Sequence, residues 1–156
     1  MNHRYTIFAD YFQIYVVDEA MARYHDDMWT ETAYIEERVA VAPGMIGISI
    51  VRNMDVPVEI EVRESEPSDP FQEWDQVVDC SLEIKDGNLA VGGPGLDDEV
   101  PRIAIKPGTY RARIFFSGLD TLSPDGLDGN DRYRIVLWPD GTTPVIVLKK
   151  HTPKSR

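Results

Sequence analysis

Cysteine is nearly absent from the sequence, which contains one thiol, at Cys80. A single cysteine excludes an internal disulfide and a cysteine-based zinc cluster. The three histidines lie far apart and form no HxH or HExxH motif. Only His25 has acidic neighbours, Asp26 and Asp27, and this combination is more typical of an exposed polar loop than of a metal site. The sequence therefore predicts no transition-metal site and no cofactor.

Long apolar runs are also missing. No run approaches the roughly 18 residues that span a membrane, and the start, "MNHRYTIFADYFQ", lacks the apolar region of a secretory signal. We expect a cytoplasmic protein that does not insert into a membrane.

Basic residues are few relative to acidic ones. The chain has 16 Lys and Arg against 27 Asp and Glu, a formal charge of -11, and an isoelectric point near 4.6. Such a chain repels nucleic acid and attracts basic proteins. We therefore expect a basic protein partner and no direct binding of nucleic acid.

Motifs for catalysis are missing as well. There is no GxSxG nucleophile motif, and "VGGPG" lacks the lysine and the helix of a phosphate-binding loop. In "VVDCSLEI", Cys80 shares its alternate face with apolar residues, which predicts a buried and inert thiol. The sequence therefore favours a protein that is not an enzyme.

What the sequence has in abundance is alternation of apolar and polar residues. Stretches such as "VPVEIEV", "TYRARIFF" and "RYRIVLW" place apolar side chains on one face, which is typical of half-buried β-strands. The alternation predicts that the core contains Ile48, Ile50, Val58, Ile60, Ile114, Ile135 and Leu137.

Turn-forming residues separate these segments. "APG", "KDGN", "KPG" and "PDG" lie between apolar runs, and "KDGN" between Ile84 and Leu89 predicts a β-hairpin. Many short strands with frequent turns predict an all-β fold, mainly an antiparallel β-sandwich, as a single domain over residues 1–156 with a flexible tail at 151–156. One short helix is expected from Glu31 to about Arg38, capped by Thr30.

Acidic residues gather in a few loops. The stretch 118–131 contains four aspartates and no base, and the stretch 58–75 contains one base, Arg63; "LDDE" adds Asp97, Asp98 and Glu99. The loop 118–131 does not fit an EF-hand. Counted from Asp128, the fifth and sixth positions, which need a ligand and a glycine, are Arg132 and Tyr133; counted from Asp120, the third position is Leu122, which is no ligand. A solvated turn, a multi-loop calcium site, acid–base chemistry and a surface for a basic partner all remain open for these acids.

Aromatic residues lie among the acids of the stretch 58–75. This composition is found in protein interfaces that have anchoring side chains surrounded by charged groups. We therefore expect a partner-binding surface formed by both stretches. Its candidate residues are Asp120, Asp125, Asp128, Asp131, Glu64, Glu66, Asp69, Phe71, Glu73, Trp74 and Asp75. Trp29 is a further aromatic candidate, although its place just before the cap Thr30 favours a packing role.

Three stretches resemble a known family. "DYFQIYVVDE", followed by "DMWTETAYIEERVAVAPGMIGISIVRNMDVPVEIEV", and later "PRIAIKPGTYRARIFF", are similar to the competence protein J family. The resemblance implies a small β-rich bacterial protein that inhibits a competence-associated DNA-entry nuclease. The sequence departs from the family pattern in its acidic loops, between Glu64 and Arg102 and at 118–131. The alternatives are a calcium- or carbohydrate-binding β-sandwich module, or a hydrolase that uses loop carboxylates.

Overall fold

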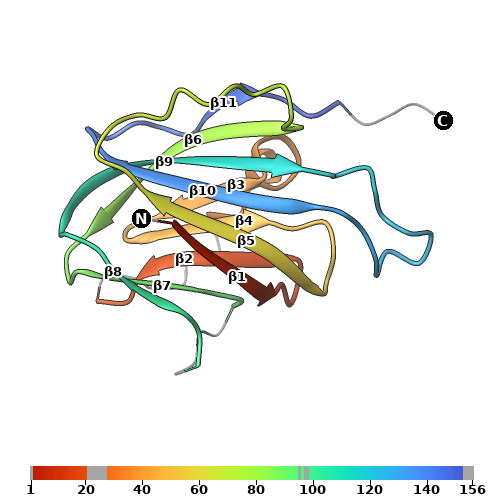
Figure 1. Cartoon of the computed structure of the whole chain (residues 1–156), viewed down its shortest axis with the longest axis horizontal. Coiled ribbons are helices and arrows are strands. Elements are labelled where there is room, and N and C mark those ends of the chain that lie inside the picture. Colours follow the sequence, from red (N-terminus) through yellow and green to blue (C-terminus); the bar gives the residue numbers. More distant parts are fainter. Residues whose placement is uncertain (1, 21–27, 95, 97–98, 153–156) are drawn as a thin grey trace.

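The computed structural model describes residues 2–20, 28–94, 96 and 99–152 (Figure 1). Within these ranges the chain forms two β-sheets. The larger sheet has the strand order β1-β5-β10-β9-β6-β11, and the smaller has the order β3-β4-β2-β7-β8. The larger sheet is formed by β1 (Asn2–Phe8), β5 (Asp55–Val62), β6 (Gln76–Ile84), β9 (Gly108–Ser117), β10 (Arg132–Pro139) and β11 (Ile146–Lys149). The smaller sheet is formed by β2 (Gln13–Asp18), β3 (Val39–Ala42), β4 (Met45–Ser49), β7 (Asn88–Gly92) and β8 (Arg102–Ala104).

The strands are antiparallel apart from one pair, β5 and β10, which run parallel. The inner faces of both sheets contribute to one apolar core. All seven core residues predicted from the alternation are at most 2% exposed. The prediction of a mainly antiparallel β-sandwich is therefore confirmed.

The turn after β6 differs from the prediction. β6 belongs to the larger sheet and β7 to the smaller, so the "KDGN" segment passes between the sheets and the predicted hairpin is wrong. β9 and β11 already pair with the two edges of β6, while β7 pairs with β2. The buried carboxylate of Asp18 accepts hydrogen bonds from the amides of Lys85 and Asp86, which ties this turn to the smaller sheet.

The predicted short helix is present as η2 (Thr32–Glu37), a π-helical segment. The Thr30 hydroxyl accepts a hydrogen bond from the Ala33 amide at 3.1 Å, as expected of a capping residue. Beside it, Trp29 donates to the Tyr15 hydroxyl at 2.9 Å. A Cβ at Gly47 would lie 2.8 Å from the Trp29 ring, so glycine permits this close packing on the smaller sheet. Trp29 therefore has a packing role.

Three parts of the sequence analysis lie outside the described residues: His25 with Asp26 and Asp27, Asp97 with Asp98, and positions 153–156 of the tail. Across the ranges that the structure does describe, helices are too short or too polar to cross a membrane.

Candidate functional site: acidic loops and the sheet beneath them

Residues 63–75, the part of the acidic stretch 58–75 that follows β5, pack on the outer face of the larger sheet. Trp74 and Phe71 from this stretch pack on Phe115 of β9, with ring centroids 5.2 and 6.1 Å apart. Trp74 is only 6% exposed. Both aromatic side chains contribute to a small apolar cluster with Val136 and Trp138. In this structure they attach the acidic stretch to the sheet instead of projecting toward solvent.

Asp69 of this stretch and Glu61 of β5 pair with Arg134 from the sheet and with Arg63 from the stretch itself. Arg134 on β10 donates to Asp69 at 2.8 Å and to Glu61 at 2.9 Å. Arg63 contacts the same two carboxylates. The hydrogen bond from Arg63 lowers the pKa of Glu61 below its usual range, and the one from Arg134 does the same for the pKa of Asp69. These carboxylates are therefore held ionised by local cations.

A second group of pairs lies beside the first. Arg113 of β9 donates from Nε to Asp79 at 2.7 Å, and from Nη2 to Glu66 at 3.2 Å. Asp75 accepts a hydrogen bond from the Leu119 amide at 2.9 Å, which links the two acidic stretches. The arginines come from strands far along the sequence, so a local count of charges overstates the free negative charge of residues 58–75.

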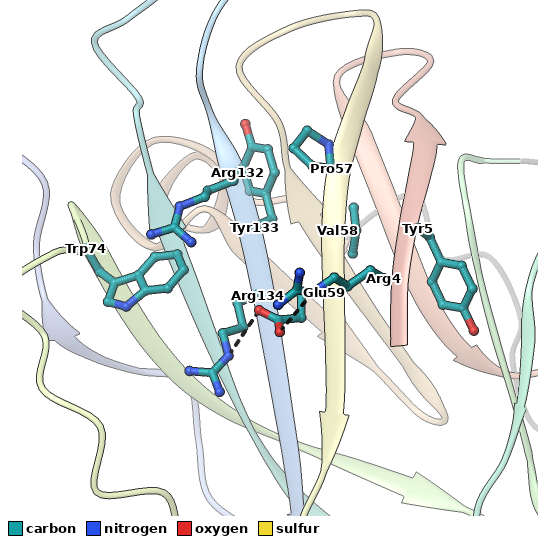
Figure 2. Close-up of a pocket in the computed structure, with 9 residues that line it drawn as sticks. All are labelled: Arg4, Tyr5, Pro57, Val58, Glu59, Trp74, Arg132, Tyr133 and Arg134. Carbon is teal, nitrogen blue, oxygen red and sulfur yellow. Dashed lines mark ion pairs between the residues drawn. The ribbon is translucent and has the colours of Figure 1, made fainter. Parts of the chain in front are cut away.

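The face of the larger sheet also contains a cleft of about 250 Å³ with a cationic rim (Figure 2). Figure 2 shows Glu59 between Arg4 and Arg134, with ion-pair distances of 3.7 and 3.4 Å. The Arg132 guanidinium lies over the Trp74 ring, 4.4 Å from its centroid, in a cation–π contact. Around Glu59 this face of the sheet therefore presents arginines from β1 and β10 as well as a carboxylate.

Asp131 differs from the other aspartates of the loop 118–131. It is 1% exposed. Its Oδ1 accepts a hydrogen bond from Arg52 at 2.6 Å, and its Oδ2 accepts one from the Tyr133 hydroxyl at 2.7 Å. Placing Asp131 on an exposed recognition surface is at odds with this burial, because Arg52 from the β4–β5 connection neutralises its carboxylate within the fold.

The remaining loop aspartates are exposed. Asp125 accepts from the Ser123 hydroxyl and from the Leu127 amide, and these bonds lower the pKa of its carboxyl group. The Ser123 hydroxyl also accepts from the Asp128 amide at 3.0 Å. Asp120 lies 3.1 Å from the His151 ring. The loop is therefore an ordered turn that presents Asp125 and Asp128 to solvent, while the Asp120 side chain is 27% exposed beside His151.

Three glutamates of the stretch 58–75 also face solvent. Glu64 and Glu73 are exposed, and the Glu66 side chain is 57% exposed despite its contact with Arg113. Six carboxylates of the predicted surface belong to exposed residues, in two groups: Glu64, Glu66 and Glu73, and Asp120, Asp125 and Asp128. Within the part of the chain that the structure describes, no three His, Cys, Asp or Glu residues are grouped to hold a metal ion.

Cys80 lies on β6 and is fully buried. Burial raises the pKa of its thiol well above the usual range, with a further contribution from the charge of Asp79. The prediction of a buried thiol is confirmed, and a group held in this protonated form is a poor nucleophile.

Sequence reasoning missed one exposed feature, the turn between β1 and β2. Phe8, Tyr11 and Phe12 are all at least partly exposed there. The sequence predicts separate strands at "YTIFA" and "FQIYVV", but this pattern does not show that the aromatic residues between and beside them are exposed. The usable signal was Asp10, which interrupts the alternation between two apolar segments.

Two sheets in this order, with acidic loops beside them, make this chain a small acidic β-sandwich protein. One solved structure of this fold is the crystal structure of ComJ, inhibitor of the DNA degrading activity of NucA, from Bacillus subtilis. It matches with a TM-score of 0.66 and 16% identity, covering 90% of this chain and 96% of that chain. A structure described as crocagin biosynthetic gene J has the same identity and coverage, with a TM-score of 0.56.

The chain therefore has the ComJ fold, as the sequence resemblance implied. No protein-family model matches the chain, and the comparison with curated proteins gives no match.

Proposed function

We propose that this protein is a non-enzymatic, cytoplasmic inhibitor that binds a basic protein, such as a competence-associated DNA-entry nuclease. The observation that carries the proposal is the likeness to ComJ, which extends over 90% of the chain. Because ComJ is described as an inhibitor of the DNA degrading activity of NucA, a nuclease is the partner class that this likeness favours.

The charge of the chain supports the same proposal. A nuclease that binds DNA presents a basic groove, and exposed carboxylates can occupy it in place of phosphates. The formal charge of -11 favours encounter with such a groove, since complementary charge accelerates association. Glu64, Glu66, Glu73, Asp120, Asp125 and Asp128 are the carboxylates assigned to contact the partner.

The buried and half-buried members of the predicted surface have a different role in this proposal. Asp131 and Asp75 hold the loop 118–131 in place through Arg52 and Leu119. Phe71, Trp74 and Asp69 hold the stretch 58–75 on the sheet. These five residues position the exposed carboxylates and do not themselves contact the partner.

The test is a titration of NucA with the purified protein while DNA cleavage is followed. We expect cleavage to fall to background near one equivalent at low salt, and we expect the protein alone neither to cleave nor to retard DNA. Uninhibited cleavage at a large excess of the protein, together with no complex on a sizing column, would refute the proposal for this nuclease.

A further inference from the structure

The β1–β2 turn presents two aromatic side chains in a fixed conformation. Tyr11 is 76% exposed and Phe12 is 37% exposed. Phe12 has a φ of 62°, a left-handed conformation that is uncommon for a bulky residue. Its amide donates to the Ala9 carbonyl at 2.7 Å, and its carbonyl accepts from the Ile50 amide at 2.8 Å. The backbone therefore holds both rings outward.

Beside this turn lies a cleft of about 450 Å³ between β1 and residues 92–94, 96 and 99–101. Its apolar lining includes Phe8, Leu96 and Val100, and its acidic lining includes Asp10 and Asp55. Neither aspartate has an ion pair or a side-chain hydrogen bond with another described residue. This distinguishes them from Asp69, Asp79 and Asp131, which are neutralised within the fold.

The turn and the acidic loop 118–131 belong to one end of the sandwich. The Phe12 amide lies 3.3 Å from Asn53 Oδ1, and the adjacent Arg52 donates to the Leu127 carbonyl at 3.2 Å. In Figure 1 the β1–β2 turn, the β4–β5 connection and the β9–β10 loop all lie toward the right of the molecule. Leu127, 47% exposed, extends the apolar surface into the loop that contains Asp125 and Asp128.

We propose that a basic protein docks at this end, with Tyr11 and Phe12 as aromatic anchors and with one of its arginine or lysine side chains in the cleft beside Asp10 and Asp55. This inference deepens the proposed function, and it rests on that function for the basic character of the partner. It adds a surface that the acidic stretches alone do not identify.

The chemistry of the surface fits such a partner. Aromatic side chains at the centre of an interface, surrounded by polar groups, contribute most of its binding energy. Arginine and lysine bury an apolar stem while keeping the charged group near solvent. The apolar walls formed by Phe8 and Leu96 suit the stem, and the two unpaired carboxylates suit the charged group.

The first arm of the test uses two synthetic hexapeptides, one of alternating arginine and leucine and one of alternating arginine and serine. Binding is followed by amide chemical shifts of the labelled protein. We expect the largest shifts from both peptides at residues 8–12, 54–55 and 99–100. Shifts spread evenly over all exposed acids would overturn the proposal.

Variants test the two carboxylates of the cleft separately from the aromatic anchor Tyr11. Asp10→Asn with Asp55→Asn should weaken both peptides roughly tenfold, since the arginine then keeps its hydrogen-bond acceptors but loses the charge of both carboxylates. Tyr11→Ala should weaken only the leucine peptide. The matched controls are Glu83→Gln with Asp86→Asn, two exposed acids elsewhere, and Ile35→Ala, an exposed apolar side chain on η2. Equal effects of site and control variants would overturn the proposal.

The second arm repeats the NucA inhibition assay with the same variants. If the unaltered protein inhibits NucA, Tyr11→Ala should raise the concentration needed for half inhibition by more than tenfold, as expected for an anchoring residue. Unchanged inhibition by both site variants would overturn the docking surface and leave the inhibitor function standing. If the unaltered protein does not inhibit NucA, the proposed function fails, and the peptide arm still decides the surface.

Discussion

Asp131 and Arg52 form a buried ion pair between residues that are 79 positions apart in the sequence, with Oδ1 and Nε separated by 2.6 Å. The Asp131 side chain is fully buried and the Arg52 side chain is 10% exposed. The Tyr133 hydroxyl completes the group, since it donates to Asp131 and accepts from the Val51 amide at 3.1 Å. This network ties the loop 118–131 to the β4–β5 connection.

Asp131→Asn should therefore destabilise the fold. The change leaves the Arg52 guanidinium buried without a counter-charge, and breaking a buried pair by altering one partner costs about 3–5 kcal/mol. The measurement is the free energy of unfolding in denaturant. Asp128→Asn, on the same loop but exposed, is the control and should stay within about 0.5 kcal/mol. Equal stability of the two variants would contradict the role assigned to the pair.

Stability at acid pH should depend on Arg134. The pKa values of Glu61 and Asp69 are lowered in the folded protein by Arg63 and Arg134. A carboxylate with a lowered folded pKa stabilises the fold above its unfolded pKa, and this contribution is lost as the pH falls through the folded pKa. The free energy of unfolding should thus begin to fall as the pH drops below about 4, the ordinary pKa of an unfolded carboxyl group.

Arg134→Met should flatten this acid dependence, because the two carboxylates then lose one of their cations and their folded pKa values move toward the unfolded ones. Melting temperatures between about pH 3 and 7 give the measurement. Lys106→Met removes an exposed cation elsewhere and serves as the control. An unaltered acid slope in Arg134→Met would show that the pairs contribute nothing to the pH response.

Ile60→Ala should cost about 2–5 kcal/mol of unfolding free energy, the range for truncating a buried aliphatic side chain. Ile60 is 0% exposed in the core between the sheets. Ile35→Ala, at a 58% exposed position on η2, should change stability far less. Denaturant unfolding of both variants compares the two sites directly, and a change within about 0.5 kcal/mol for Ile60→Ala would be inconsistent with its burial.

The strands were predictable because their signal is local. Alternation with period two places Ile114 and Ile135 on one face in any half-buried strand, and the structure buries both. The pairing of strands is not local, and the "KDGN" turn illustrates this. A short turn with glycine suits a hairpin, but it also suits a passage between sheets when the preceding strand is already paired on both edges.

The acidic surface was only half predictable for a similar reason. Sequence shows that Asp69 and Asp131 lie in stretches poor in base, but their partners Arg134 and Arg52 come from distant strands and loops. Ion pairing across a fold depends on register and topology, which local charge counts do not contain. The exposed aspartates 125 and 128 lie in a Gly-rich turn, where local composition is a good guide.

The last prediction concerns the three exposed aspartates of the loop 118–131. Asp120→Asn, Asp125→Asn and Asp128→Asn together should slow association with NucA and leave the melting temperature nearly unchanged. Single exposed charges contribute only about 0–1 kcal/mol, so the effect should come from the combined field of the loop. Adding Asp131→Asn would also lower stability, which is why this residue is left intact.

The measurement is the association rate at low and at high salt. Exposed charges are screened beyond about 8 Å at physiological ionic strength, so the rate of the unaltered protein should fall clearly as salt is added, and the rate of the triple variant should fall less. Glu83→Gln with Asp86→Asn removes exposed charge elsewhere and should retain most of the salt response. Identical rates and salt responses for the triple variant and the unaltered protein would mean that the loop is merely solvated, and that its carboxylates do not guide the partner.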